Sequence, residues 1–347
     1  MREKLRDIID SYAAEKGFSG VIRITMGDRI LLDYAVGYED AERKIPFSEQ
    51  SMFTFYSMSK PLCVFGLMRL AERGLLSLDA HPAEYLPIAR GLHPDLTLRC
   101  MLSHTSGLPD FEQTKEFFER YGADESLNIR DLLPEILSYP MEFAPSQGAK
   151  YANVNFVMCA MIIEELSGQS YSDYMKNEVF LPLGMKHAIL DHPKMEIPHR
   201  VVGYDRDETG RIYPVRRAYF GCLGAGDVVG RLEDAYCLYH AVRERRLLAE
   251  QSWKEILTPS PLNGMGLGCW VTPWHGTTRI LHTGGHTGYR NLHAYLPQED
   301  FDILLLSNYG FGRGREELSN EIYACIFGED DALSMQVQMD QGYIKPV

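Results

Sequence analysis

The 347-residue sequence lacks two features that would point to large charged or lipid partners. No apolar run approaches the roughly 18 residues that a membrane span requires, so we expect no membrane-embedded helix. Basic residues are also not in excess, because 35 Lys and Arg stand against 48 Asp and Glu, a net charge of −13. An acidic chain is poorly suited to bind nucleic acid through a broad surface. We therefore expect no nucleic-acid or membrane partner and favour a small-molecule or peptide partner.

The sequence also lacks the motifs that indicate paired cysteines, a metal site or the nucleophile elbow of many hydrolases. The seven cysteines are odd in number and scattered, without a C-x-x-C pair, which predicts reduced and mostly buried thiols. No H-E-x-x-H occurs, and the glycines between His282 and His286 argue against a metal-binding helix. No G-x-S-x-G nucleophile elbow occurs either. We expect neither a metal nor a cofactor.

The first residues carry no signal-peptide apolar core, which predicts a cytoplasmic protein. They mix both signs of charge, and their apolar residues recur at helical spacing: Leu5, Ile8, Ile9 and Tyr12. An amphipathic helix is therefore expected at the start of the chain.

Strand and helix patterns divide the rest of the chain. Residues 20–37 read as two strands around a Gly27-Asp28 turn, and residues 269–307 return to strand patterns. From about 80 to 265 the pattern is mainly helical. We predict an α/β (α+β) fold with an antiparallel sheet flanked by helices plus a mainly helical lobe. The sheet lobe is expected at about 1–56 and 266–328, the helical lobe at about 57–265, and a C-terminal tail at 329–347.

The stretch from Phe53 to Arg73 predicts a buried helix that carries a nucleophile. Ser57 and Lys60 are three positions apart, so on one helical face the lysine amine can reach the serine hydroxyl. A helix that begins near Ser57 also directs free N–H groups at negative charge developing there. Because S-x-x-K also arises by chance, and a serine before a helix is usually an N-cap, this motif needs support elsewhere.

Tyr151-Ala152-Asn153 is the second candidate, at the start of a long apolar helix. A phenol near the Lys60 amine loses its proton more readily, because positive charge favours the phenolate. Tyr151 would then be a general base for Ser57, with its phenol and the serine hydroxyl both in reach of Lys60. Asn153 would hold Lys60 or donate to a substrate carbonyl. The alternative is a structural Tyr-Asn pair at a helix start.

His282-Thr283-Gly284-Gly285 follows a predicted strand over Thr278 to Leu281. Two glycines let a strand edge approach a ligand, and the N–H groups of Gly285 and Ser57 would form an oxyanion hole. His282 and Thr283 would face the substrate. The alternative is a turn with a solvated histidine. For His104, a structural role at a helix end is favoured over that of a catalytic base.

In this order, Ser-x-x-Lys, Tyr-x-Asn and His-Thr-Gly resemble the serine β-lactamase and penicillin-binding-protein superfamily, specifically its class C β-lactamase-like branch. The resemblance extends over roughly residues 15 to 327 and includes the sequences LSHTSGL at 102–108 and PLGM at 182–185. It implies a β-lactamase/transpeptidase-like fold, with residues 1–328 as one catalytic unit and the active serine between the two lobes.

The resemblance also implies roles for the candidate residues. Ser57 would be the acylated nucleophile, Lys60 its proton partner, and Tyr151 the base that also protonates the leaving group. Asn153, together with Thr283 and Gly284, would bind the substrate. His282 departs from the pattern, since many relatives carry lysine in a Lys-Thr-Gly motif. A histidine of ordinary pKa near 6.5 is mostly neutral at pH 7 and lacks a fixed charge for a substrate carboxylate.

These observations predict a metal-independent serine hydrolase that forms an acyl-enzyme with a small ester, amide or peptide. His282 favours esterase or D-amino-acid peptidase activity over β-lactamase or D,D-carboxypeptidase activity. Lowering the pH from about 8 to 5.5 should protonate His282. Its positive charge should then reduce the preference for neutral esters over substrates that carry a carboxylate. If another residue recognises the charge of the substrate, the candidates are Arg216, Arg217 and Arg290. Loops that form the walls of the pocket are expected near 110–125, 205–222 and 286–292. The non-catalytic alternatives are a penicillin-recognising sensor and a ligand-binding protein, and the oligomeric state is not indicated.

Overall fold

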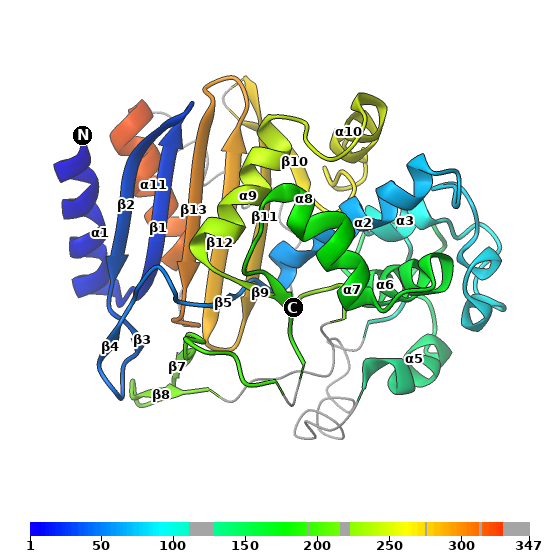
Figure 1. Ribbon diagram of the computed structural model, residues 1–347, viewed down its shortest axis with the longest axis horizontal. Helices are drawn as coiled ribbons and strands as arrows, with labels where there is room; N and C mark the ends of the chain where they lie inside the picture. The colour runs from blue at the N-terminus through cyan, green and yellow to red at the C-terminus, as the bar shows by residue number, and fades with distance from the viewer. Residues whose placement is uncertain (111–127, 193–194, 216–222, 275, 312–313, 329–347) are drawn as a thin grey trace.

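A six-stranded antiparallel sheet forms the centre of the protein, and its strands come from both ends of the chain (Figure 1). The computed structural model describes residues 1–110, 128–192, 195–215, 223–274, 276–311 and 314–328. Arg216, Arg217, the expected tail and parts of two expected pocket-wall loops lie outside these ranges. The order of the strands is β10 (Trp270–Trp274), β11 (Thr277–His286), β12 (Tyr289–Leu296), β13 (Phe301–Ser307), β1 (Gly20–Met26) and β2 (Arg29–Val36).

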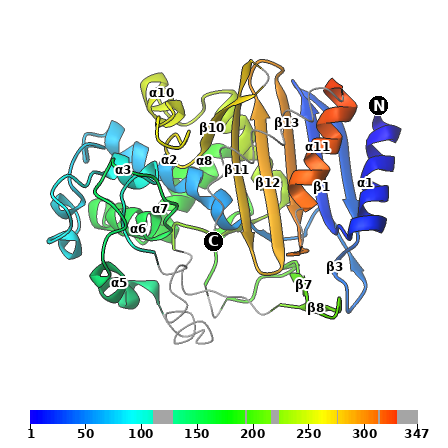
Figure 2. The same ribbon diagram turned by 180° about the vertical axis from the view of Figure 1, so that it is seen from behind.

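Both faces of this sheet are covered by helices (Figures 1 and 2). On one face pack α1 (Arg2–Lys16) and α11 (Gly314–Phe327), in a core that includes Leu305 of β13. On the other face pack α9 (Leu232–Arg243) and the helical part of the chain, in a larger core that includes Leu306. Neighbouring residues of a strand point to opposite faces, so Leu305 and Leu306 enter different cores. The predicted fold class is confirmed.

The helical part of the chain lies beside one edge of the sheet (Figure 1). Its helices are α2 (Lys60–Glu72), α3 (Leu98–Leu102), α5 (Ile129–Ser138), α6 (Val154–Ser167), α7 (Tyr171–Met175), α8 (Leu181–Leu183) and α10 (Glu250–Leu257), with the 3-10 turns η1 (Tyr56–Ser59), η2 (Pro82–Glu84) and η3 (Pro87–Ala89) and the π-turn η5 (Lys176–Phe180). Helix α6 ends at Gly168, whose φ of 67° is a left-handed cap that glycine adopts without steric cost.

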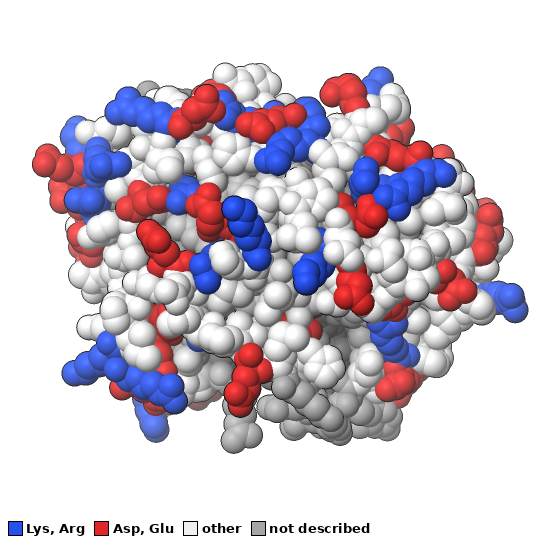
Figure 3. Space-filling model, viewed as in Figure 1, with Lys and Arg blue, Asp and Glu red and all other residues white. Residues whose placement is uncertain are grey.

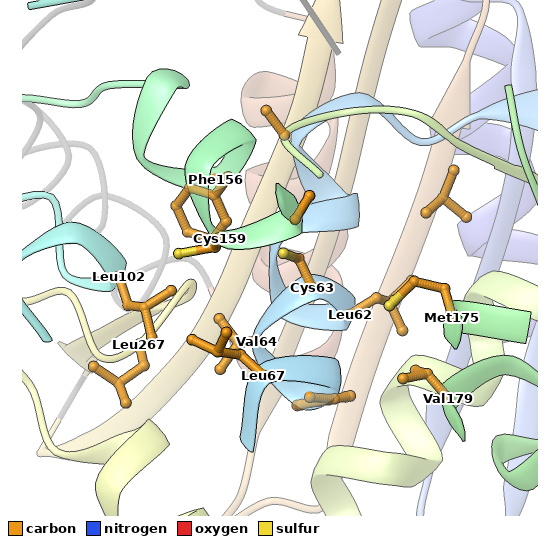
Figure 4. Packing of buried hydrophobic residues seen from close by; sticks show 14 of the residues in the cluster. Leu62, Cys63, Val64, Leu67, Leu102, Phe156, Cys159, Met175, Val179 and Leu267 are labelled. Carbon is orange, nitrogen blue, oxygen red and sulfur yellow. The ribbon is translucent and has the colours of Figure 1, made fainter. Parts of the chain in front are cut away.

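Helix α2 is buried on nearly all sides. Ten of its 13 residues are buried, which is typical of a helix packed within a core. Figure 4 shows Phe156 and Cys159 of α6 on one side of α2, and Met175 and Val179 on another. The first residue of α2, Lys60, is itself fully buried, so close packing surrounds its side chain.

The structure differs from the prediction in two places. Short strands occur within or beside the region expected to be helical: β5 (Phe53–Thr54), β6 (Ile189–Leu190) and β9 (Val228–Gly230) form one sheet, β7 (Tyr204–Arg206) pairs with β8 (Ile212–Pro214), and β3 (Tyr38–Asp40) pairs with β4 (Ile45–Pro46). Strands of two or three residues are too short to show alternation in a sequence. Strand β11 also continues past its expected end at Leu281 to His286, because β12 pairs with it along this length.

Acidic and basic side chains intermingle on the face shown in Figure 3, without a broad basic area there. No helix in the described part of the chain is long and apolar enough to cross a membrane. The six described cysteines are free thiols, and four are buried: Cys63, Cys100, Cys159 and Cys269. This agrees with the expectation of reduced, mostly buried thiols.

Candidate active site

A strained turn presents the hydroxyl of Ser57. The turn η1 follows strand β5 closely and begins at Tyr56, whose φ is 49°. Aromatic residues seldom adopt this left-handed conformation, which costs roughly 1–3 kcal/mol and is retained where surrounding contacts impose it. The ring of Tyr56 lies 5.2 Å from that of Tyr289. Within residues 51–60, Ser57 is the one residue that is not buried, so the turn leaves its side chain accessible.

Lys60 follows Ser57 by three residues and contacts three oxygen atoms. Its Nζ lies 3.0 Å from Ser57 Oγ, 2.8 Å from Asn153 Oδ1 and 2.7 Å from the backbone oxygen of Ala225. The predicted contact between Lys60 and Ser57 is confirmed. The amide oxygen of Asn153 and the carbonyl of Ala225 can only accept hydrogen bonds, so Lys60 must donate to both.

Asp110 determines the orientation of the Asn153 amide. The buried carboxylate accepts hydrogen bonds from Asn153 N–H at 3.0 Å, from Asn153 Nδ2 at 3.1 Å and from Val154 N–H at 3.2 Å. A carboxylate only accepts, so the nitrogen end of the amide must face Asp110. The oxygen end therefore faces Lys60.

These contacts leave one direction for proton transfer. A neutral amine has two N–H donors and one lone pair, and both donors are required by Asn153 and Ala225. The lone pair of neutral Lys60 then points at the Ser57 hydroxyl, 3.0 Å away, from which it can accept the proton. In its protonated form Lys60 instead donates to Ser57 Oγ.

Tyr151 meets Lys60 through the face of its ring. Lys60 Nζ lies 4.7 Å from the ring centroid, within the range of a cation–π contact. The predicted hydrogen bond from the amine to the phenol is therefore wrong for this structure, since the amine is directed at three other oxygens.

His104 positions Tyr151. The two rings stack at 4.2 Å, and His104 Nδ1 accepts the N–H of Ala152 at 3.0 Å. Burial, followed by the charge of Lys60, lowers the pKa of His104 well below its usual value, so the ring is neutral at pH 7. This geometry supports the structural role expected for His104.

Strand β11 approaches the Ser57 turn because Gly284 has no side chain. Strand β10 pairs with residues 277–281 of β11, and beyond them β11 lies against η1. A Cβ on Gly284 would lie 2.0 Å from the backbone oxygen of Phe55. Gly285 is exposed, so its backbone is available to a ligand, and Thr283 is half-buried. The structure thus brings the predicted strand edge to Ser57, with Gly284 packed against the turn.

His282 is buried, with 2% of its surface exposed, and not solvated. Burial and then the charge of Lys60 lower the pKa of His282 to about 3. The predicted titration between pH 5.5 and 8 is therefore wrong, although the predicted neutrality at pH 7 is confirmed. His282 Nδ1–H donates to the Thr283 carbonyl at 2.6 Å, and Nε2 has no hydrogen-bond partner among the described residues. His282 and Thr283 also point to opposite faces of the strand, so they cannot meet a substrate from the same side.

Two buried carboxyl groups near Lys60 were not indicated by the motifs. One is Asp110, whose position directly after the LSHTSGLP sequence was the available signal. The other is Asp227, which accepts the N–H of Gly224 at 3.0 Å in the segment that carries the Ala225 carbonyl. Burial raises the pKa of Asp227 to about 7 against the opposing effect of Lys60.

Among the described residues, no three His, Cys, Asp or Glu side chains group as metal ligands.

Known proteins are similar to this chain in sequence and in fold. A family model described as Beta-lactamase matches residues 5–324. Penicillin-binding protein 4* of Bacillus subtilis is 27% identical over 330 residues, covering 88% of this chain and 72% of that protein. Esterase EstB of Burkholderia gladioli is 31% identical over 196 residues, covering 53% and 50%. The crystal structure of D-amino acid amidase from Ochrobactrum anthropi SV3 has a TM-score of 0.78 at 21% identity, covering 98% of this chain and 100% of that chain.

Proposed function

Because the chain belongs to the Beta-lactamase family, we propose that it is a serine hydrolase that forms an acyl-enzyme at Ser57 with a small ester or amide. The observation that carries this proposal is the placement of Lys60, 3.0 Å from Ser57 Oγ and held by two obligate acceptors. This placement supports Lys60 as the group that takes the Ser57 proton and later gives it to the leaving group, with the Tyr151 ring beside the ammonium.

In the first step the Ser57 proton moves to Lys60, and Ser57 Oγ attacks the carbonyl carbon of the substrate. The carbonyl oxygen becomes an oxyanion, which the backbone N–H groups of Ser57 and Gly285 stabilise. The bond to the alcohol or amine then breaks. The leaving group takes the transferred proton from the Lys60 ammonium, which the ring of Tyr151 stabilises through its cation–π contact until that transfer. Water hydrolyses the acyl-enzyme by the reverse set of proton transfers and restores Ser57.

The proposed substrate carries no carboxylate that needs a cation at the position of His282. His282 stays neutral above about pH 3, and its ring is buried, so it offers a substrate anion no positive charge. An esterase among the relatives and an amidase among proteins of the same fold support a neutral ester or amide. β-Lactam hydrolysis and D,D-carboxypeptidase activity are the alternative, which the penicillin-binding relative supports.

Fluorophosphonate labelling followed by intact-mass analysis tests the nucleophile. Wild type should gain one adduct and Ser57→Ala none, because the label requires an activated serine. Ser138→Ala, at an exposed serine of α5, is the matched control and should label like wild type. An adduct of undiminished yield on Ser57→Ala would assign the nucleophile to another residue.

A substrate panel tests the class of reaction. Neutral p-nitrophenyl esters and D-amino acid amides should turn over faster than penicillins of similar size. One equivalent of penicillin bound covalently without turnover of any ester or amide would indicate a sensor. Absence of acylation by every ester, amide and lactam would indicate a ligand-binding protein.

A further inference from the structure

A cavity of about 220 Å³ lies between the end of α1 and the start of α11. We refer to it as the α1–α11 cavity. Its polar lining comes from both helices and from the ends of β12 and β13, and it includes Tyr12, Lys16, Arg290, Ser307, Arg315 and Glu317.

The central sheet separates this cavity from the catalytic residues. Asn291 points to the Ser57 turn, where its Nδ2 donates to the backbone oxygen of Thr54 at 3.0 Å. Its neighbour Arg290 therefore points to the opposite face. The same face of β11 meets Arg315, whose Nη1 lies 3.1 Å from the position that a Cβ on Gly285 would occupy. A ligand in the α1–α11 cavity would thus lie behind the strand that carries the proposed oxyanion hole.

The walls of the cavity carry more positive than negative charge. Lys16, Arg290 and Arg315 contribute three cations, whereas Glu317 contributes one carboxylate. That carboxylate already accepts a hydrogen bond from the Tyr12 hydroxyl at 2.8 Å. In a chain whose net charge is −13, such a local excess of positive charge favours an anion.

Arg290, like Lys16, forms no ion pair with the residues that the structure describes. Its Nη1 donates to the backbone oxygens of His286 and Tyr289, both at 2.8 Å, and it forms no ion pair with any residue in the described ranges. Arg315, by contrast, is paired with Glu316 at 2.5 Å. Burial, and next the charge of Arg315, lower the pKa of Arg290, while Asp205 and Glu316 act in the opposite direction. An anion beside Arg290 would offset both unfavourable effects.

We propose that the α1–α11 cavity binds a small organic carboxylate, with its charged group against Arg290 and Lys16. The planar guanidinium offers parallel donors that match a carboxylate, and its Nε and Nη2 make no hydrogen bond to any residue that the structure describes. Aromatic side chains of Phe18, Tyr309 and Phe311 line the remainder and would contact an apolar body. This site is independent of the reaction proposed at Ser57.

Calorimetric titration with sodium benzoate tests the site, with the uncharged isostere benzamide as the ligand control. Benzoate should bind saturably with one site per chain, and benzamide at least tenfold more weakly. Arg290→Gln should weaken benzoate binding at least tenfold. Lys16→Gln, at the exposed end of α1, should weaken it severalfold without affecting the sheet. Arg29→Gln removes the same charge at an exposed position at the other end of the sheet and should bind like wild type.

Crystals soaked with 4-bromobenzoate locate the ligand through the anomalous signal of bromine. A peak between α1 and α11 would support the proposal. A peak beside Ser57 with none behind β11 would overturn it, as would equal affinities for benzoate and benzamide. Unchanged affinity in both Arg290→Gln and Lys16→Gln, or absence of saturation up to the solubility limit of benzoate, would also overturn it.

Discussion

At the scale of single residues, Asp110 controls what Lys60 can do. Asp110→Asn would place an amide, which can face Asn153 with either end, where the carboxylate imposes one orientation. Loss of a hydrogen bond to a charged group costs about 1.5–3 kcal/mol, so kcat/KM for a neutral ester should fall roughly 10- to 150-fold. Thermal melting checks that the variant folds, and Asp7→Asn on the exposed face of α1 is the control. Wild-type kcat/KM in a folded Asp110→Asn protein would refute this role.

Asp227 supplies a titration near neutral pH beside Lys60. Its pKa is raised to about 7, so it is uncharged below that pH and becomes a carboxylate above it. A new negative charge favours the ammonium form of Lys60 over the free amine, so kcat/KM should fall as Asp227 ionises. The measurement is kcat/KM from about pH 6 to 9, where wild type should show this fall with rising pH. In Asp227→Asn the fall should occur at a higher pH. If the dependence of kcat/KM on pH is the same in the variant as in wild type, the fall belongs to the titration of another group.

The titration of His282 affects the free energy of unfolding at acidic pH and not the pH dependence of kcat/KM near neutrality. Its pKa is about 3 in the folded protein and about 6.5 when unfolded, so between these values the unfolded chain binds the extra proton. The free energy of unfolding therefore falls with falling pH, by at most about 1.4 kcal/mol per pH unit for this group. Urea titrations of His282→Asn between about pH 4 and 6 should show a shallower decline than wild type. His187→Asn, at an exposed position, should keep the wild-type slope.

At the scale of elements, the catalytic geometry depends on how closely β11 approaches η1. Gly284→Ala would place a methyl group 2.0 Å from the backbone oxygen of Phe55, so the strand or the turn must move. The free energy of unfolding should fall by roughly 1–3 kcal/mol, and fluorophosphonate labelling of Ser57 should slow at least tenfold.

Gly285→Ala is the matched comparison on the same strand. Its Cβ would meet Arg315 Nη1 at 3.1 Å and the Tyr289 oxygen at 3.2 Å, and the arginine end can yield. This variant should lose less stability than Gly284→Ala. Equal labelling rates for Gly284→Ala and wild type would show that the close approach is not required.

At the scale of the whole molecule, Arg243 ties together three segments that are distant in sequence. From α9 it donates to both carboxylate oxygens of Asp300 at 2.7 Å and to Asp28, in the β1–β2 turn, at 2.5 Å. Arg243→Gln should lower the free energy of unfolding by about 1.5–3 kcal/mol in urea titrations. Asp28→Asn should cost less stability than Arg243→Gln, because Asp28 is 91% exposed and solvent screens its ion pair. If Arg243→Gln unfolds at the same urea concentration as wild type, the ion pairs of Arg243 do not contribute to stability.

The sequence by itself determined the local elements and the order of the motifs. The hairpin around Gly27-Asp28, the end of α6 at Gly168 and the strands β12 and β13 follow from periodicity and turn chemistry, which depend on neighbouring residues. The placement of Ser57 near the start of α2, with Lys60 three residues later, is local in the same way. The division of residues 1–328 into two lobes stays a prediction.

Only the tertiary structure decided protonation and hydrogen-bond partners at the site. Asn153 meets Asp110 across 43 residues and Lys60 across 93, and Lys60 meets Ala225 across 165. No local pattern encodes these contacts, so the orientation of the Asn153 amide and the direction of the Lys60 lone pair follow from packing. The pKa of His282 depends on burial for the same reason: the sequence shows a histidine beside glycines, while the charged state depends on which elements remove water from the ring.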